Sequence, residues 1–148
     1  MESVYQQVKN FKKKYPKTIT HHRLMKHAKV IEMHLNPGEV VEYAFPAQKN
    51  AKTGDFFETC IVAITNERLL IAQKRVFPGY FLSSITPDLY NDMQVKAGFI
   101  WASVTIDTVK ELIELSNIDK KALPEIETKV TSFMMEAKKK YGKNDSID

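Results

Sequence analysis

The feature that most constrains the fold is a series of seven short β-prone segments between residues 40 and 115. The segments are rich in valine, isoleucine, threonine and aromatic residues, which favour strands. We expect strands at residues 40–45, 56–65, 69–73, 80–85, 92–96, 102–107 and 112–115. Pro46 closes the first segment, and turn residues at 66–67, 78–79 and 110–111 separate neighbouring ones. Turn signals about every 8–12 residues are typical of an antiparallel sandwich or barrel.

The C-terminal part of the chain carries the pattern of one long amphipathic helix. Its apolar residues recur at intervals of three and four, and they are Ile126, Val130, Phe133, Met134, Ala137 and Tyr141. Pro124 suits the first turn, the lysines at 138–140 favour the negative end of the helix dipole, and Gly142 suits the end. Such a helix needs an apolar surface to cover, and a curved sheet with an open end provides one.

The first 35 residues predict two further amphipathic helices. The apolar stripes consist of Val4, Val8, Phe11 and Tyr15 in the first helix, and of Leu24, Ala28, Ile31 and Leu35 in the second. Pro16 ends the first helix. We expect Thr18 or Thr20 to cap the second, which ends at residues 36–38. Because short isolated helices are marginal in water, both need a surface to pack against.

Charge and cysteine content narrow the class of protein. The net charge is +4, from 22 Lys+Arg and 18 Asp+Glu, so the basic excess is mild; short lysine runs occur at 12–14 and 138–140. Cys60 is alone and cannot form an internal disulfide, which suits a reducing compartment. The N-terminus lacks the apolar stretch of a secretory signal, and no apolar run approaches the roughly 20 residues that span a bilayer. We therefore expect a cytoplasmic protein.

Four short motifs occur in an order that resembles the bacterial pleckstrin-homology-like (PH-like) domains. They are Leu-Asn-Pro-Gly-Glu at 35–39, a Thr-x-x-Arg-Leu turn within 64–70, Lys-Ala-Gly at 96–98 leading into the segment 102–106, and Ile-Asp-Lys-Lys at 118–121. Together they are similar to the YokE-like branch of that family, over roughly residues 36–140. The resemblance implies a PH-like seven-stranded antiparallel curved sheet or barrel, capped by a C-terminal α-helix. The N-terminal helical extension lies outside the resemblance, and with it the expected fold class is α+β.

The resemblance also implies a division of the chain and a general role. We expect a helical extension at 1–35, a PH-like domain at 36–142 and a polar tail at 143–148. The family implies a binding module without a defined ligand, because fold is weak evidence for function. Inositol-phosphate PH domains cluster basic residues in the first hairpin loop. Here the loop at 48–56 holds two lysines against Asp55, which argues against phosphoinositide binding.

No residue pattern indicates catalysis, a metal site or a cofactor. Cys60 lies within an apolar strand segment, where it is expected to be a buried hydrophobe rather than a nucleophile. His27 and His34 are seven residues apart, about 10 Å along a helix, which is too far to share one ion. The chain has no glycine-rich phosphate-binding loop. We therefore expect no enzyme, no metal and no cofactor.

The candidate binding residues fall in three places. Phe99, Ile100 and Trp101 occupy a bend between strands; if exposed they are an anchor for a partner or a membrane, and if turned inward they belong to the core. Lys74 and Arg75 lie near Phe77, Tyr80 and Phe81, which is the nearest approach to a nucleic-acid-binding pattern. The alternative is an exposed hairpin, and nucleic acid is not the expected ligand.

Arg68 is the third candidate, because its planar guanidinium can bind an anion. Its alternative role is to satisfy carbonyls of the turn at 66–67 or to pair with an acid such as Glu67 or Asp92.

Two functional hypotheses follow. The first is a non-catalytic scaffold that binds a protein or peptide, and can also bind itself as a homo-oligomer, through a sheet edge or the loop at 99–101. The alternative is a peripheral membrane module that binds anionic lipid through the lysine runs and the same aromatic loop. The first predicts a concentration-dependent oligomer, and the second predicts salt-sensitive binding to anionic vesicles.

Overall fold

The computed structural model describes residues 3–20, 23–49, 59–75 and 79–145. Its elements are α1 (Val4–Lys14), α2 (Leu24–Met33), β1 (Val41–Lys49), β2 (Thr59–Thr65), β3 (Leu69–Lys74), β4 (Tyr80–Ile85), β5 (Tyr90–Ala97), β6 (Trp101–Thr108), β7 (Leu112–Asp119), the 3-10 helix η1 (Lys120–Ala122) and α3 (Leu123–Asp145). The predicted α+β arrangement of N-terminal helices, seven antiparallel strands and a C-terminal helix is confirmed. The loop of the first predicted hairpin and the start of its second strand, residues 50–58, lie outside the described residues. Phe77 and Pro78, in the turn between β3 and β4, lie outside them as well.

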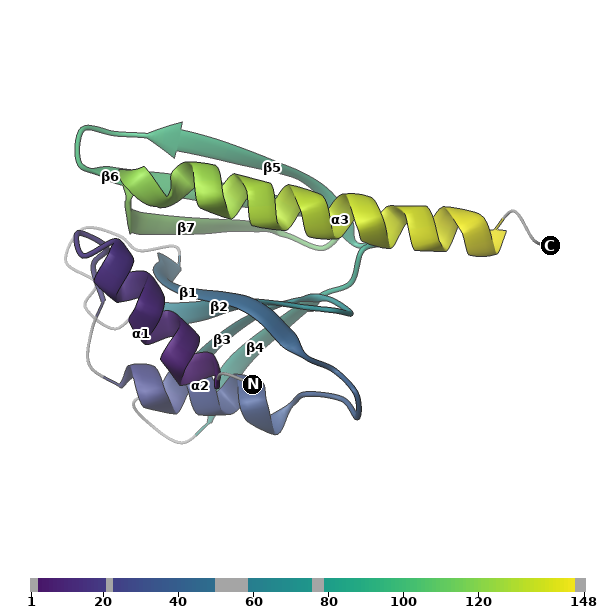
Figure 1. The fold of residues 1–148 in the computed structure, drawn as a ribbon, viewed down its shortest axis with the longest axis horizontal. Helices are drawn as coiled ribbons and strands as arrows, with labels where there is room; N and C mark the ends of the chain where they lie inside the picture. The colour runs from purple at the N-terminus through teal and green to yellow at the C-terminus, as the bar shows by residue number, and fades with distance from the viewer. Residues whose placement is uncertain (1–2, 21–22, 50–58, 76–78, 146–148) are drawn as a thin grey trace.

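The seven strands form one strongly curled sheet in the order β4-β3-β2-β1-β7-β6-β5. Strands β1 and β7 join its two halves, and the pairs between them within the described part of the chain are Gln48 with Ser116 and Lys49 with Leu115. Because this junction is short, the halves β1–β4 and β5–β7 diverge away from it (Figure 1). Helix α3 runs along the half that contains β5–β7, whereas α1 and α2 lie against the half that contains β1–β4 (Figure 1).

Two apolar clusters stabilise this arrangement, one on each face of the β1–β4 half. The inner cluster joins the sheet to α3 and includes Phe45, Val62, Ile71, Ile106, Leu115 and Ile126. The outer cluster joins the sheet to α1 and α2 and includes Val8, Ile31, Ile61, Ala63 and Leu70. Every residue of β2 is buried because both of its faces are covered. Each large aliphatic side chain buried in this way contributes about 1.5–3 kcal/mol relative to exposure.

Helix α1 belongs to both clusters. The predicted stripe Val4, Val8, Phe11 and Tyr15 is buried, and the Ser3 side chain caps the helix by accepting from the Gln6 N–H. Val4 and Val8 face the outer cluster, whereas Phe11 and Tyr15 reach into the inner one. The centroid of the Phe11 ring lies 5.5 Å from that of Phe45. The helix therefore fills part of the gap between the diverging halves of the sheet.

The predicted cap of the second helix is wrong. Helix α2 begins after Arg23, which has a left-handed backbone conformation (φ 88°) and makes no side-chain cap. Thr18 is buried instead, and its hydroxyl accepts from the Asp119 N–H at 2.9 Å. The Ile19 N–H donates to the Asn117 carbonyl at 2.9 Å. These contacts hold the connection between the two helices against β7, several residues before α2 begins.

The predicted end of the first strand at Pro46 is also wrong. Strand β1 continues through Pro46, which lies opposite Ile61 of β2, to Lys49. Proline lacks an N–H and is tolerated where one side of a strand has no ladder partner. That condition holds at Pro46, because pairing with β7 begins only at Gln48.

Helix α2 is attached to β3 by a buried histidine whose neutral form is required. The Nδ1 atom of His27 accepts from the Lys74 N–H at 2.7 Å, and the residue is 4% exposed. Burial, together with the charge of Arg23, lowers the pKa of His27 to about 4. An unfolded chain has an ordinary histidine pKa near 6.5, so between these values only the unfolded state takes up the proton.

We therefore expect the free energy of unfolding to fall by about 3 kcal/mol as the pH drops from 7.5 to 4. Urea denaturation at a series of pH values measures it. In His27→Gln, which keeps an acceptor but does not titrate, this part of the pH dependence should be missing. An unchanged pH profile in that variant would assign the dependence to other groups.

Candidate functional site

The most exposed apolar residues of the β5–β6 hairpin form a compact turn, here called the aromatic loop (residues 98–101). The Gly98 N–H donates to the Trp101 carbonyl at 2.8 Å and closes the turn. A Cβ atom at Gly98 would lie 2.8 Å from that carbonyl oxygen, so the close approach requires glycine. Phe99 is 91% exposed, Trp101 41% and Ile100 36%. Of the two alternatives that the sequence left open, the structure shows the exposed one.

The aromatic loop is held at its base by segments that are distant in sequence. The Trp101 indole N–H donates to the Lys17 carbonyl at 2.7 Å. The Lys120 N–H donates to the Ile100 carbonyl at 3.2 Å, and its ammonium lies 5.9 Å from the centroid of the Phe99 ring. The loop is therefore tied on one side to the connection between α1 and α2, and on the other to η1. Phe99 remains as its free tip.

A buried aspartate organises the residues that support the aromatic loop. The Asp119 carboxylate accepts from the Lys17 N–H at 3.3 Å and from the Lys121 N–H at 3.0 Å, so it also caps η1. The Lys12 ammonium donates to the Thr18 carbonyl in the same region. Burial lowers the pKa of Lys12, and the charge of Asp119 offsets part of that effect. The carboxylate is thus used internally and does not contribute an exposed negative charge.

The surface around the aromatic loop is basic. Lys17, Lys120 and Lys121 are exposed and belong to the segments that hold the loop, and Lys96 is exposed one residue before Ala97 at the end of β5. An exposed phenylalanine surrounded by lysines can bind an apolar pocket with an acidic rim, or an anionic lipid surface. None of the described helices is long and apolar enough to cross a bilayer.

Arg68 is occupied by a structural ion pair. Its Nε lies 2.9 Å from Oε2 of Glu39, whose side chain is buried, and its other nitrogens donate to Glu39 Oε1, the His34 carbonyl and the Ser84 hydroxyl. Burial acts to raise the pKa of Glu39, but hydrogen bonds from Arg68, Asn36 and Thr65 outweigh it and lower the pKa. The expected pairing with an acid is confirmed, and the acid is Glu39, which reaches the guanidinium from the segment before β1.

Lys74 and Arg75 lie at the β3–β4 hairpin, on the other half of the sheet from the aromatic loop. The Lys74 ammonium donates to the Gly79 carbonyl at 3.1 Å, and the Arg75 carbonyl accepts from the Arg23 guanidinium at 3.3 Å. Their backbone and side-chain contacts close the hairpin and attach it to the start of α2. The structure therefore does not bring these two residues into one site with the aromatic loop.

The remaining chemical candidates are dispersed. Cys60 is buried, and His27 faces β3 as described above. His34 contacts the Val30 carbonyl through Nδ1 and the Tyr80 hydroxyl through Nε2. Within the described part of the chain, no group of three or more His, Cys, Asp and Glu side chains is placed to hold a metal ion.

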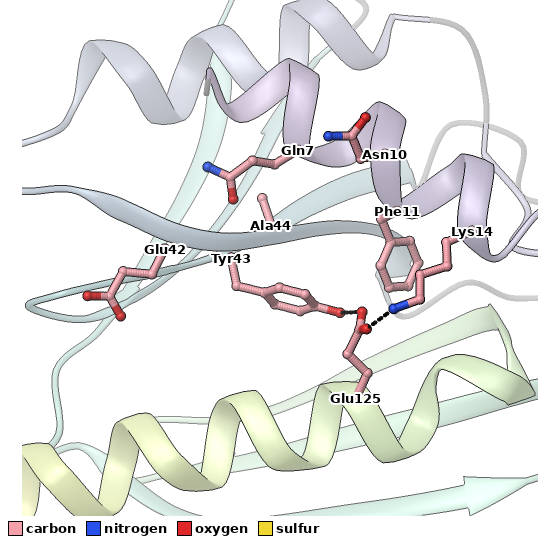
Figure 2. Close-up of a pocket in the computed structure, with 8 residues that line it drawn as sticks. All are labelled: Gln7, Asn10, Phe11, Lys14, Glu42, Tyr43, Ala44 and Glu125. Carbon is pink, nitrogen blue, oxygen red and sulfur yellow. Dashed lines mark hydrogen bonds and ion pairs between the residues drawn. The ribbon is translucent and has the colours of Figure 1, made fainter. Parts of the chain in front are cut away.

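A cleft of about 230 Å³ lies between α1, β1 and the start of α3 (Figure 2). Its lining residues are Gln7, Asn10, Phe11, Lys14, Glu42, Tyr43, Ala44 and Glu125. The Tyr43 hydroxyl donates to one oxygen of Glu125 at 2.8 Å, and the Lys14 ammonium lies 2.6 Å from the other (Figure 2). Burial and Glu125 raise the pKa of Tyr43, while the bonds from Lys14 and Tyr43 outweigh burial and lower the pKa of Glu125.

These contacts leave Glu125 as an ionised bridge between α1 and α3 rather than a general base, since both of its oxygens are occupied. No sequence pattern indicates this cluster, because its members come from three separate segments, each of which is ordinary in its local pattern.

A curled seven-stranded antiparallel sheet closed by a C-terminal helix is the architecture of PH-like domains. Residues 35–132 match the family described as Bacterial PH domain, and the chain belongs to that family. A crystal structure of a pleckstrin homology domain from Shewanella amazonensis SB2B is similar, with a TM-score of 0.50 and 15% sequence identity. The alignment covers 84% of this chain and 98% of that one, and it supports the fold. None of the curated proteins matches this chain. Members of this family are in general non-catalytic binding modules.

Proposed function

We propose that this bacterial PH domain binds a protein or peptide partner, with Phe99 of the aromatic loop as the anchor. The observation that supports it is an almost fully exposed phenylalanine on a turn whose base is held by the Trp101–Lys17 hydrogen bond. Holding the turn in advance lowers the entropy lost on binding, so a rigid aromatic residue is suited to an apolar pocket. We propose that Arg68 stabilises the fold through its ion pair with Glu39 and does not contact the partner.

The charge around the anchor indicates the chemistry of the partner. Lys17, Lys120 and Lys121 are exposed beside the loop, while Asp119 is buried beneath it. Complementary charge speeds association and excludes wrong partners, so the partner surface is acidic around an apolar pocket. Ile100 and Trp101 extend the apolar contact at the side of Phe99.

Within the family, we place the chain in the YokE-like branch, on the motifs at 35–39, 64–70, 96–98 and 118–121. We also propose the division into an extension at 1–35, a PH-like unit at 36–142 and a polar tail at 143–148, although helix α3 continues through the first three residues of that tail. The start of the family match at residue 35 supports the first boundary. A cytoplasmic location is supported by the single buried cysteine.

The experiment compares partner capture by the wild type, Phe99→Ala and Val109→Ala. Val109 is 65% exposed at the β6–β7 turn and serves as the matched control for loss of an exposed apolar side chain. The partner is first identified by cross-linking to the wild type, and its affinity for each variant is then measured. Loss of a hot-spot anchor costs about 2 kcal/mol or more, so we expect this partner to bind Phe99→Ala at least about thirtyfold more weakly than the wild type. Val109→Ala should retain it. The proposal fails if both variants retain the partner equally.

The second candidate function is attachment to an anionic membrane, which the exposed lysines beside Phe99 favour. Co-sedimentation with phosphatidylserine-containing and neutral vesicles distinguishes a membrane ligand from a protein partner. Pelleting only with anionic vesicles, lost in high salt and in Phe99→Ala, would replace the protein partner by a lipid surface.

A further inference from the structure

Strand β5 is the terminal strand of the sheet, and among the described residues it pairs only with β6. In Figure 1 its outer side lies at the top of the molecule, with no strand beside it. A strand in this position presents unpaired backbone N–H and C=O groups along one side, which can pair with another strand. From Asp92 to Ala97 its register with β6 is regular, so the edge is continuous there.

From Asp92 to Lys96 the side chains of β5 alternate between two environments. Met93 and Val95 are half-buried and face the groove between β5 and α3, whereas Asp92, Gln94 and Lys96 are exposed, with Asp92 also at the border of that groove. The exposed set carries a negative charge at one end, a neutral amide in the middle and a positive charge at the other. An antiparallel second copy presents the same three residues in reverse order, so each charge meets an opposite charge.

We propose that β5 pairs with β5 of a second copy of this chain, antiparallel about a two-fold axis that passes through Gln94. In this register Asp92 lies opposite Lys96 of the second copy, and the same pair repeats on the other side of the axis. Gln94 lies opposite Gln94, and Met93 lies opposite Val95, so like environments meet on each face. The surface is distinct from the aromatic loop, and the inference does not rest on the proposed function.

Neighbouring registers do not provide the same complementarity. Residues directly opposite each other on the two strands share a face of the sheet. Each allowed register therefore places one residue opposite the same residue of the second copy, and the two-fold axis lies at that pair. An axis at Asp92 places two aspartates together, and an axis at Lys96 places two lysines together. An axis at Met93 leaves Asp92 opposite Gln94. Of these four positions, Gln94 alone forms both opposite-charge pairs.

The groove beside β5 also favours a second copy. It has a volume of about 250 Å³ between β5 and α3, and its apolar lining is formed by Met93, Val95, Met134 and Met135. Met135 is 58% exposed. The Met93–Val95 contacts across the axis extend this apolar floor into the second copy, on the same face as the two α3 helices. The opposite edge, β4, has no charged residue, so its pairing with β5 would leave Asp92 and Lys96 unmatched.

A charge-reversal series on the full chain tests the register, with sedimentation equilibrium over a range of concentrations as the measurement. We expect a dimer for the wild type. Lys96→Asp and Asp92→Lys should each weaken it by about tenfold or more, because two attractive contacts become repulsive. The double variant Asp92→Lys/Lys96→Asp should restore the wild-type affinity. All of these positions are exposed on the surface, and circular dichroism confirms that each variant is folded.

Three outcomes would overturn the inference. A wild type that stays monomeric at every concentration would mean that the charged edge prevents pairing instead of directing it. Rings or polymers insensitive to Lys96→Asp would indicate a different interface, such as β4 with β5. Dissociation by Phe99→Ala would place the interface at the aromatic loop; conversely, a Phe99→Ala protein that loses its partner but still dimerises separates the two proposals.

Discussion

Replacing Arg68 with alanine is expected to lower the free energy of unfolding by about 3–5 kcal/mol. The guanidinium contacts both oxygens of Glu39 at 2.9 Å, and the Glu39 side chain is inaccessible to solvent. Without Arg68, the carboxylate keeps the Thr65 hydroxyl at 2.6 Å but has no opposite charge. The hydrogen bond to the His34 carbonyl is lost as well, so the segment between α2 and β1 is released from β3.

The measurement is urea denaturation at pH 7.5 with Arg75→Ala as the matched control. Arg75 is exposed at the end of the β3–β4 hairpin, and surface substitutions of this kind change stability by about 0.5 kcal/mol or less. The double variant Arg68→Met/Glu39→Leu should recover much of the loss, because it removes both charges together. Equal stabilities of Arg68→Ala and Arg75→Ala would show that the ion pair does not stabilise the fold.

The pH dependence of the single variant provides a second readout. In the wild type the pKa of Glu39 is lowered, so its contribution to stability is present above the ordinary carboxyl pKa and is lost as the pH falls. Once Arg68 is absent, burial dominates and the pKa of Glu39 should rise. The variant should then recover relative to the wild type in acid, since a protonated Glu39 no longer needs a cation.

The elements of the fold were predictable because their signals are local. Alternation marks β6, where Val104 and Ile106 are both buried, and intervals of three and four mark α3, where Ile126 and Val130 are buried. Each pattern is contained within one segment and needs no knowledge of its neighbours. The same reasoning located the aromatic loop, because three large apolar residues follow Gly98 between two strand patterns.

The contacts that organise the site were not predictable, because they join segments that are far apart in sequence. The Trp101–Lys17 hydrogen bond spans 84 residues, and the Arg68–Glu39 pair spans 29. Thr18 has the properties of a helix cap in its local sequence, yet tertiary contact with Asp119 determines its role. Exposure of Phe99 depends on how the hairpin end is held, so the local pattern left both alternatives open.

Helix α1 precedes the family match, and its position raises the question of whether it unfolds separately from the sheet or together with it. Phe11 packs against Tyr15 and Phe45 within the inner cluster, with ring centroids 4.9 and 5.5 Å apart. Lys14 of the same helix contacts Glu125 of α3. A helix that only decorated the outer face would make neither contact. We therefore expect α1 to unfold together with the sheet.

Phe11→Ala tests this directly, and we expect it to lower the free energy of unfolding by about 3–5 kcal/mol in a single cooperative transition. The cost comes from lost burial and from the cavity left between Tyr15 and Phe45. Phe99→Ala removes the same atoms from an exposed position and should change stability by about 0.5 kcal/mol or less. Far-ultraviolet circular dichroism and tryptophan fluorescence, which reports Trp101, should show coincident transitions. If Phe11→Ala instead separates an early loss of helix from a later loss of the sheet, the N-terminal helices are an independent layer, and Phe11 is not needed by the strands that it touches.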